Sequence, residues 1–220
     1  MKIQDVELEW LGHASFKVGY RGKTIFIDPY QLKTEEKADI ILITHSHYDH
    51  CSLPDIEKIV KDGTIVICTA DSQSNINRIQ KKIEIVLLEP EKEVSLRDVR
   101  IKAVRAYNSS KQFHLKSESW VGYLLFLGKT VIYHAGDTDV IKEMSNIPEE
   151  TKKLYLIALL PVGGTYTMTA QEAAKAAEII KPSLAIPMHF GSGIGTEADG
   201  KKFVELCQEK GINAEMLEKS

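Results

Sequence analysis

Apolar and polar residues alternate with a period of two through the first third of the chain, which is typical of half-buried strands. A tight turn at Arg21-Gly22 separates two of these strands. The run 40–43 is apolar throughout, which predicts a buried strand. The strands predicted up to residue 134 are 6–10, 14–20, 24–27, 40–43, 64–69, 83–88, 94–105 and 120–134, the last with a hairpin turn at Gly128.

Helices are predicted where the apolar period lengthens and capping residues mark the ends. Pro54 lies in the first turn of one helix and Gly63 follows its end. Thr169 and Glu172 have the spacing of a capping box, and Pro182 stops the helix that they open. The predicted helices are 53–61, 70–81, 140–144, 169–180 and 197–210, and the strands among them in the second half are 154–160, 183–188 and 214–217. This order predicts an α/β (α+β) fold of two packed sheets with helices outside.

The segment directly after the buried strand 40–43 concentrates metal-ligand residues. It contains His45, His47, Asp49 and His50 within six positions. Side chains two apart on a strand point the same way, and a turn can bring the last two back toward the first two. Imidazole and carboxylate are ligands for zinc, iron and manganese. A purely structural cluster would leave several polar rings crowded at a strand end with few partners, so we interpret the segment as a metal site.

Three further ligand-type residues follow strands elsewhere in the chain. Asp137 comes after the strand that ends near residue 134, in a turn loosened by Gly136. His189 follows the strand 183–188, and His114 lies in a polar loop between two strands. A single histidine at a strand end is most often structural, but three separate strand ends that each carry a potential ligand favour an open metal site on rigid elements.

Composition limits the remaining classes of function. The chain has 220 residues, 43% of them hydrophobic and 27% charged, with a net charge of -3, which fits one large globular domain without a basic nucleic-acid surface. No apolar run approaches the length of a membrane span, and the N-terminus lacks a signal-peptide core. The three cysteines form no pair motif, so we expect reduced thiols and a cytoplasmic protein.

Taken together, these residues resemble the metallo-β-lactamase superfamily over essentially the whole chain. The superfamily pattern includes Gly136-Asp-Thr. The segments Trp10-Leu-Gly-His-Ala-Ser-Phe, Ile27-Asp-Pro and Leu160-Pro-Val-Gly-Gly-Thr-Tyr-Thr-Met narrow the resemblance. They are similar to a largely uncharacterised branch of metal-dependent hydrolases, related to ascorbate-phosphate lactonases and to N-acylphosphatidylethanolamine phospholipase D. The resemblance implies a four-layer αβ/βα sandwich of two mixed sheets flanked by helices, formed by a single domain over residues 1–220.

The resemblance also implies a ligand set. His45, His47 and a third histidine would hold a first metal, Asp49, His50 and His189 a second, and Asp137 would bridge them. We expect two zinc ions, while the ligand types leave manganese, iron and nickel open.

The third histidine is the position where this chain departs from the family pattern. Many members have a histidine in an Ala-x-His segment, which here reads Ala106-Tyr-Asn108, and the next histidine is His114. We assign His114 as the ligand because imidazole binds these metals better than an amide does. A site completed by Asn108 or by water is the alternative.

The chemistry that follows is hydrolysis by a metal-activated hydroxide. Asp49 is expected to bind metal and to accept a proton from the attacking water. His13 either lines the site or is a hydrogen-bonded structural residue. Asp28 either orients a ligand imidazole or caps a turn. The glycine-rich segment with Tyr166 and Thr167 either contacts substrate or only turns the backbone.

We therefore expect an enzyme acting on a small or phosphorylated metabolite that contains an ester, lactone or phosphodiester. A nucleic-acid phosphodiesterase is an alternative, although the acidic charge and the absence of an appended binding domain argue against a nucleic-acid partner. A mononuclear-iron oxidoreductase with the same ligands is the other alternative. We expect a small-molecule substrate and no membrane partner, and the sequence leaves both a monomer and a homo-oligomer open.

Overall fold

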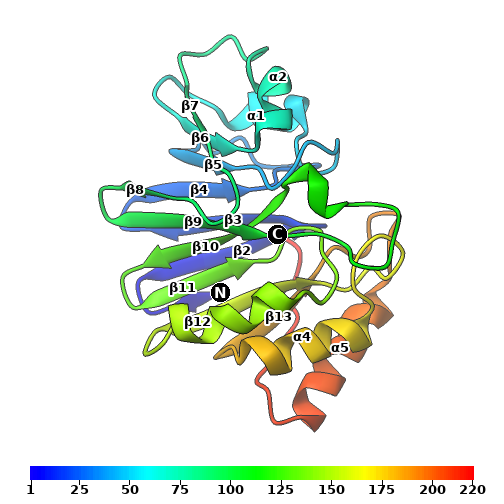
Figure 1. Ribbon diagram of the computed structural model, residues 1–220. Helices are drawn as coiled ribbons and strands as arrows, with labels where there is room; N and C mark the ends of the chain where they lie inside the picture. The colour runs from blue at the N-terminus through cyan, green and yellow to red at the C-terminus, as the bar shows by residue number, and fades with distance from the viewer. The chain divides into compact units, whose positions relative to one another are not determined.

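The computed structural model describes residues 1–220 and divides the chain into two compact units, each built on its own β-sheet. Unit 1 comprises residues 1–89 and 218–220, and unit 2 comprises residues 90–217 (Figure 1). The single domain expected over 1–220 stays a prediction. No helix is both long and apolar enough to cross a bilayer.

Unit 1 contains a mixed seven-stranded sheet in the order β1-β2-β3-β4-β5-β6-β7. Strands β1 to β4 pair antiparallel, and β4 to β7 pair parallel. The predicted turn joins β3 to β4, and both Arg21 (φ 47°) and Gly22 (φ 75°) have the positive φ that a two-residue hairpin favours. The elements are β1 (Lys2–Ile3), β2 (Val6–Gly12), β3 (Ser15–Tyr20), β4 (Lys23–Ile27), β5 (Ile40–Leu42), α1 (Leu53–Ile59), β6 (Ile65–Cys68), the 3₁₀ turn η1 (Ala70–Ser72), α2 (Gln73–Ile76) and β7 (Glu84–Leu87).

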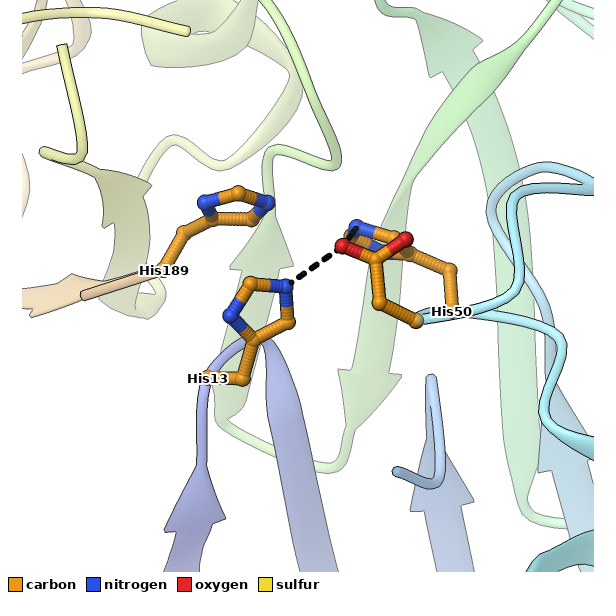
Figure 2. A group of neighbouring side chains, drawn as sticks. His13, His50 and His189 are labelled. Carbon is orange, nitrogen blue, oxygen red and sulfur yellow. Dashed lines mark hydrogen bonds and ion pairs between the residues drawn. The ribbon is translucent and has the colours of Figure 1, made fainter. Parts of the chain in front are cut away.

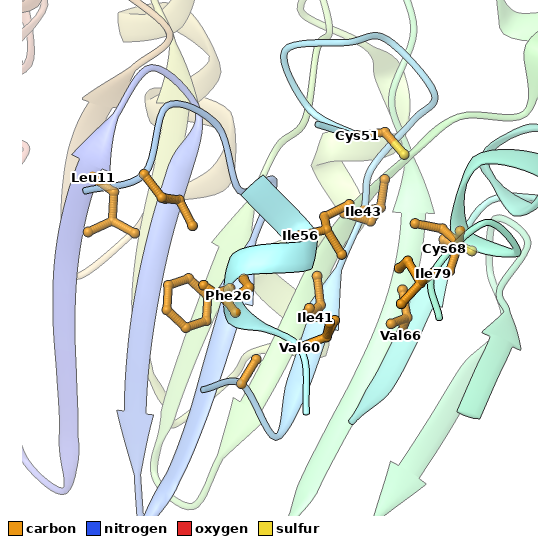
Figure 3. Packing of buried hydrophobic residues seen from close by; sticks show 14 residues of the cluster. Leu11, Phe26, Ile41, Ile43, Cys51, Ile56, Val60, Val66, Cys68 and Ile79 are labelled. Carbon is orange, nitrogen blue, oxygen red and sulfur yellow. The ribbon is translucent and has the colours of Figure 1, made fainter. Parts of the chain in front are cut away.

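Helix α1 covers the parallel part of this sheet. Ile41 of β5 and Val66 of β6 are register partners, and both belong to one buried apolar cluster. Figure 3 shows Ile56 of α1 beside Ile41 and Ile43, so the helix closes over the strand that leads into the histidine-rich segment. Burying each such side chain contributes about 1.5–3 kcal/mol, which fixes the start of that segment on a rigid base.

Unit 2 contains a mixed six-stranded sheet in the order β13-β12-β11-β10-β9-β8. Helix α4 contacts β12, α5 contacts β13, and the two helices lie side by side (Figure 1). The predicted capping box is confirmed, since Thr169 Oγ1 accepts a hydrogen bond from the Glu172 backbone N–H at 3.2 Å. The elements are β8 (Glu93–Leu96), β9 (Val99–Arg105), η2 (Lys116–Glu118), β10 (Val121–Leu127), β11 (Thr130–His134), η3 (Lys142–Asn146), α3 (Ile147–Glu150), β12 (Tyr155–Pro161), α4 (Ala170–Ile180), β13 (Leu184–Met188) and α5 (Glu197–Glu209).

Three predicted elements were wrong in extent or type. The helix expected over 70–81 is only the 3₁₀ turn η1 followed by α2, which ends at Ile76, because serine and asparagine, which are frequent in this segment, favour turns over helix interiors. The helix expected over 140–144 is the 3₁₀ turn η3. The strand expected over 214–217 is a single bridge between Ala214 and Ala185.

Strand direction brings the candidate residues of each unit to one edge of its sheet. In unit 1, strands β2, β4 and β5 run in the same direction, and their carboxyl ends lead to His13, Asp28 and His45. In unit 2, strands β9, β11 and β13 likewise share a direction, and Asp137 and His189 follow the last two.

Candidate metal centre

The histidine-rich segment of unit 1 forms a compact turn after β5. The backbone N–H groups of His50 and Cys51 both donate to the carbonyl of His47, at 3.0 and 2.8 Å. This turn brings His50 back toward His45, and their ring centroids lie 4.1 Å apart. His45, Asp49 and His50 are buried, whereas His47 is exposed. The segment therefore presents donors from both of its ends at one place.

The spacing of these donors suits a shared ion. His45 Nε2 lies 3.1 Å from His47 Nδ1, and His50 Nε2 lies 4.0 Å from Asp49 Oδ2. Two ligand atoms bound to one ion at about 2.1 Å lie about 3.0–3.4 Å apart in octahedral or tetrahedral geometry. The His45–His47 pair fits this range as it stands.

A buried carboxylate, Asp28, orients two of the histidines. His50 Nδ1 donates to Asp28 Oδ2 at 2.7 Å, and Thr44 Oγ1 donates to the same oxygen at 2.6 Å. Because the single hydroxyl proton of Thr44 points to Asp28, Thr44 accepts from His45 Nδ1 at 2.9 Å. Both imidazoles thus carry their proton on Nδ1, which leaves the lone pair of Nε2 for a metal. The orienting role predicted for Asp28 agrees with this arrangement but stays a prediction.

His13 lies at the end of β2 and contacts the carboxylate of Asp49. Its Nε2 is 3.0 Å from Asp49 Oδ2, and Figure 2 shows this contact beside His50. The His13 carbonyl accepts a hydrogen bond from Trp10 Nε1 at 2.9 Å, which fixes the backbone of the turn. His13 is therefore a neighbour of a predicted ligand within unit 1.

Unit 2 gathers its three candidate ligands around one carboxylate oxygen. His114 Nε2 and His189 Nε2 each lie 3.2 Å from Asp137 Oδ2, and all three residues are buried. The spacing again matches ligand atoms around an ion. An oxygen shared by two imidazoles is suited to a bridging position between two ions.

The loop that carries His114 is closed by its own backbone. The Asn108 N–H donates to the His114 carbonyl at 2.7 Å, and His114 Nδ1 donates to the Tyr166 carbonyl at 3.1 Å. The Asn108 side-chain amide also donates to that carbonyl, at 2.7 Å. His114 Nε2 lies against Asp137 Oδ2, whereas the amide nitrogen of Asn108 donates to the Tyr166 carbonyl. This arrangement favours the histidine over the amide as third ligand.

An ion pair between Lys111 and Asp139 anchors the same loop. Asp139 also accepts from the backbone N–H groups of Ser109 and Ser110. Burial raises the pKa of the Asp139 carboxyl, but Lys111 and these hydrogen bonds outweigh it and hold the pKa below its ordinary value. Neither this ion pair nor the role of Thr44 was predicted from the sequence, although a hydroxyl directly before a ligand histidine is a signal for the latter.

Four candidate residues have a left-handed backbone, which is strained for residues other than glycine. The φ values are 53° for His13, 45° for Asp28, 56° for His114 and 61° for His189. Such a conformation costs about 1–2 kcal/mol per residue and is concentrated at functional sites. Gly136 also has a positive φ (64°), and a Cβ there would lie 2.6 Å from the Val121 carbonyl oxygen, so the turn that presents Asp137 requires glycine.

Cys51, which directly follows His50, and the residues Tyr166 and Thr167 lie outside the donor sets. Burial, followed by the charge of Asp28, raises the pKa of the Cys51 thiol to about 12, so Cys51 stays protonated and packs in the apolar cluster of unit 1. Tyr166 is partly exposed, whereas Thr167 is fully buried. Their roles as substrate contacts stay predictions.

Comparison with known proteins identifies the family. Residues 7–189 match the family described as beta-lactamase superfamily domain. The chain is 36% identical over 217 residues to a metal-dependent hydrolase of Pyrococcus furiosus (93% of each chain) and 34% identical over 213 residues to one of Thermoplasma acidophilum (93% of this chain, 92% of the relative).

Solved structures agree. A proposed metal-dependent hydrolase of Parabacteroides distasonis superposes with a TM-score of 0.83 at 30% identity, over 97% of this chain and 94% of that one. A metallo hydrolase of Ignicoccus hospitalis gives 0.80 at 25% identity, over 98% and 96%. These neighbours confirm the predicted fold of two mixed sheets flanked by helices. The chain belongs to the metallo-β-lactamase superfamily, among its metal-dependent hydrolases.

Proposed function

We propose that this hydrolase uses a dinuclear centre to cleave an ester, lactone or phosphodiester of a small or phosphorylated metabolite. His45, His47 and His114 would hold one divalent ion, Asp49, His50 and His189 the other, and Asp137 would bridge them. The observation that carries the proposal is the convergence of two imidazole Nε2 atoms on one Asp137 oxygen, 3.2 Å from each. We propose zinc because imidazole and carboxylate donors at this spacing suit it.

When bound, such ions lower the pKa of a coordinated water to near neutrality and polarise a carbonyl or phosphoryl oxygen. Asp49 accepts the proton that the attacking water releases. His13, 3.0 Å from Asp49 Oδ2, holds this carboxylate in place. Asp28 and Thr44 keep the Nδ1 protons of His50 and His45 in hydrogen bonds, so these rings cannot rotate away from the centre.

The alternative functions have weaker support. A diiron β-hydroxylase of Streptomyces venezuelae superposes with a TM-score of 0.75, but at 16% identity this likeness concerns the fold alone. The net charge of -3 offers little attraction to nucleic-acid phosphates. A small-molecule hydrolase therefore remains the proposal.

Metal content and activity of matched variants test the proposal. Elemental analysis of wild type, His114→Ala and Asn108→Ala would be combined with hydrolysis of bis-p-nitrophenyl phosphate and p-nitrophenyl acetate. We expect about two zinc ions per wild-type chain, loss of one in His114→Ala, and little loss in Asn108→Ala.

The outcomes separate the alternatives. Equal metal content in wild type and His114→Ala, with loss in Asn108→Ala, would overturn the third-ligand assignment. A single iron per chain with no hydrolysis of either substrate would overturn the hydrolase in favour of the oxidoreductase.

A further inference from the structure

Two exposed apolar side chains flank the predicted ligand His114. Phe113 is 50% exposed and Leu115 is 45% exposed, whereas His114 between them is 3% exposed. They are two of only five large hydrophobic side chains that the whole chain exposes. Exposed apolar groups beside a polar centre are typical of ligand sites, where a few polar groups lie among apolar walls.

The ring of Phe113 is held in a defined place. It meets the ring of Tyr166 edge to face, with centroids 4.9 Å apart and an interplanar angle of 89°. The carbonyl of the same Tyr166 accepts the hydrogen bond from His114 Nδ1 at 3.1 Å. One residue therefore positions both the exposed ring and the imidazole, which ties the apolar surface to the metal donors of unit 2.

Both lysines of this loop are paired with carboxylates. Lys111 is paired with Asp139, and Lys116 lies 3.0 Å from Glu143. Lys116 also sits 4.6 Å from the centre of the Tyr107 ring. Because both lysines are in ion pairs, the loop presents an apolar surface rather than an unpaired cation. This favours a substrate that places an apolar group here over one that places an anionic group here.

We propose that Phe113, which packs on Tyr166, and Leu115 bind the acyl or aryl group of the substrate and select esters with a long apolar substituent. The inference rests on the proposed hydrolase function. It makes Phe113 a specificity-determining residue that does not bind metal, so its loss changes substrate preference without changing metal content.

Chain-length preference tests this inference. Hydrolysis of p-nitrophenyl acetate, butyrate and octanoate would be compared between wild type, Phe113→Ser and Leu87→Ser. Leu87 is a matched control because it is 43% exposed and lies on β7, at the edge of the unit 1 sheet and two strands from β5.

We expect wild type to have a lower KM for octanoate than for acetate. Phe113→Ser should raise the ratio of the KM for the octanoate ester to that for the acetate ester about 5–10-fold, with zinc content within about twofold of wild type. Leu87→Ser should behave as wild type. Equal KM changes for all three esters, or the same change in Leu87→Ser, would overturn the inference.

A binding measurement separates failure of this inference from failure of the proposed function. If the zinc-loaded protein hydrolyses none of the esters and no phosphodiester, the proposed function fails. Calorimetric titration with octanoate and acetate then tests Phe113 alone. Tighter binding of octanoate to wild type, lost in Phe113→Ser, supports the apolar site, and equal binding of the two acids overturns it.

Discussion

The two units build their metal donors in different ways. In unit 1 the four predicted ligands lie within six consecutive positions, and the side chains of Asp28 and Thr44 orient two of them. In unit 2 the three predicted ligands come from separate loops, and a main-chain carbonyl, that of Tyr166, orients His114. The first set depends on a few side chains, whereas the second depends on the path of the backbone.

This difference has consequences for mutation. An orienting carboxylate can be removed by one substitution, but a main-chain carbonyl survives any change of its own side chain. Unit 2 instead relies on the path of its backbone, for example at Gly136, where a Cβ would lie 2.6 Å from the Val121 carbonyl oxygen. Substitutions at orienting positions should therefore affect metal binding more in unit 1 than in unit 2.

The largest effect is expected at Asp137, because one oxygen serves both histidines of unit 2. Asp137→Asn keeps the volume but removes the charge, so kcat/KM should fall about 10²–10³-fold, the loss of several kcal/mol of metal-centred stabilisation. Steady-state kinetics with bis-p-nitrophenyl phosphate and elemental analysis would measure it. Asp5→Asn, at an exposed position before β2, is the control, and wild-type zinc content in Asp137→Asn would contradict the shared-oxygen assignment.

Asp28→Asn and Tyr166→Ala test the contrast between the two units directly. Asp28→Asn disturbs the hydrogen bonds to both His50 and Thr44, so the zinc dissociation constant should rise about 10–100-fold. Tyr166→Ala keeps the carbonyl that His114 uses, so its dissociation constant should stay within about threefold of wild type. Competition with a zinc-binding dye would give both values, and a larger effect in Tyr166→Ala would reverse the comparison.

A pH-dependent effect on stability is expected at Asp55 in α1, which holds the loop after β4. Its carboxylate accepts from the backbone N–H groups of Gln31 and Leu32 and pairs with Lys58 at 2.8 Å. Burial raises the pKa of this carboxyl, but Lys58, Ser52 and the backbone donors lower it more, so the folded-state pKa lies below the ordinary 3.8.

Because the folded-state pKa of Asp55 is lowered, the ionised carboxylate stabilises the folded protein. The stabilisation is fully present above about pH 4 and is lost as the pH falls through the folded-state pKa. Asp55→Asn should lower the free energy of unfolding by about 1.5–3 kcal/mol at pH 7, and the difference from wild type should shrink below pH 4. Urea titrations at pH 7 and pH 3 would measure it, and a pH-independent difference would exclude the charge as its cause.

The smallest effect is expected at the cap of α4 in unit 2. Thr169→Ala removes the hydrogen bond to the Glu172 N–H and should cost about 1 kcal/mol of unfolding free energy. Thr169→Ser keeps the hydroxyl and should lose much less. In unit 1, Ser52 precedes α1 without capping it, and its hydroxyl donates instead to Asp55 Oδ2 at 2.6 Å, so Ser52→Ala would test that hydrogen bond and not a helix cap.

Local pattern predicted most elements and failed where it was weak. The run 154–160 corresponds closely to β12 because it is almost entirely apolar, and 169–180 corresponds closely to α4 because a capping box marks its start. The segment 70–81 has helical spacing of its apolar residues but no capping box, and only the four residues of α2 form an α-helix there. The last expected strand, 214–217, is replaced by a single bridge between Ala214 and Ala185.

The sequence by itself determined the family, the strand ends that carry candidate ligands and the donor types, because these depend on residues near one another in the chain. Only the tertiary structure decided which nitrogen of each histidine is available to a metal. That choice depends on hydrogen bonds from His50 to Asp28 and from His114 to Tyr166, across 22 and 52 positions of sequence. Sheet register and loop closure bring such partners together, and a local pattern of residues does not specify contacts between residues so far apart in the chain.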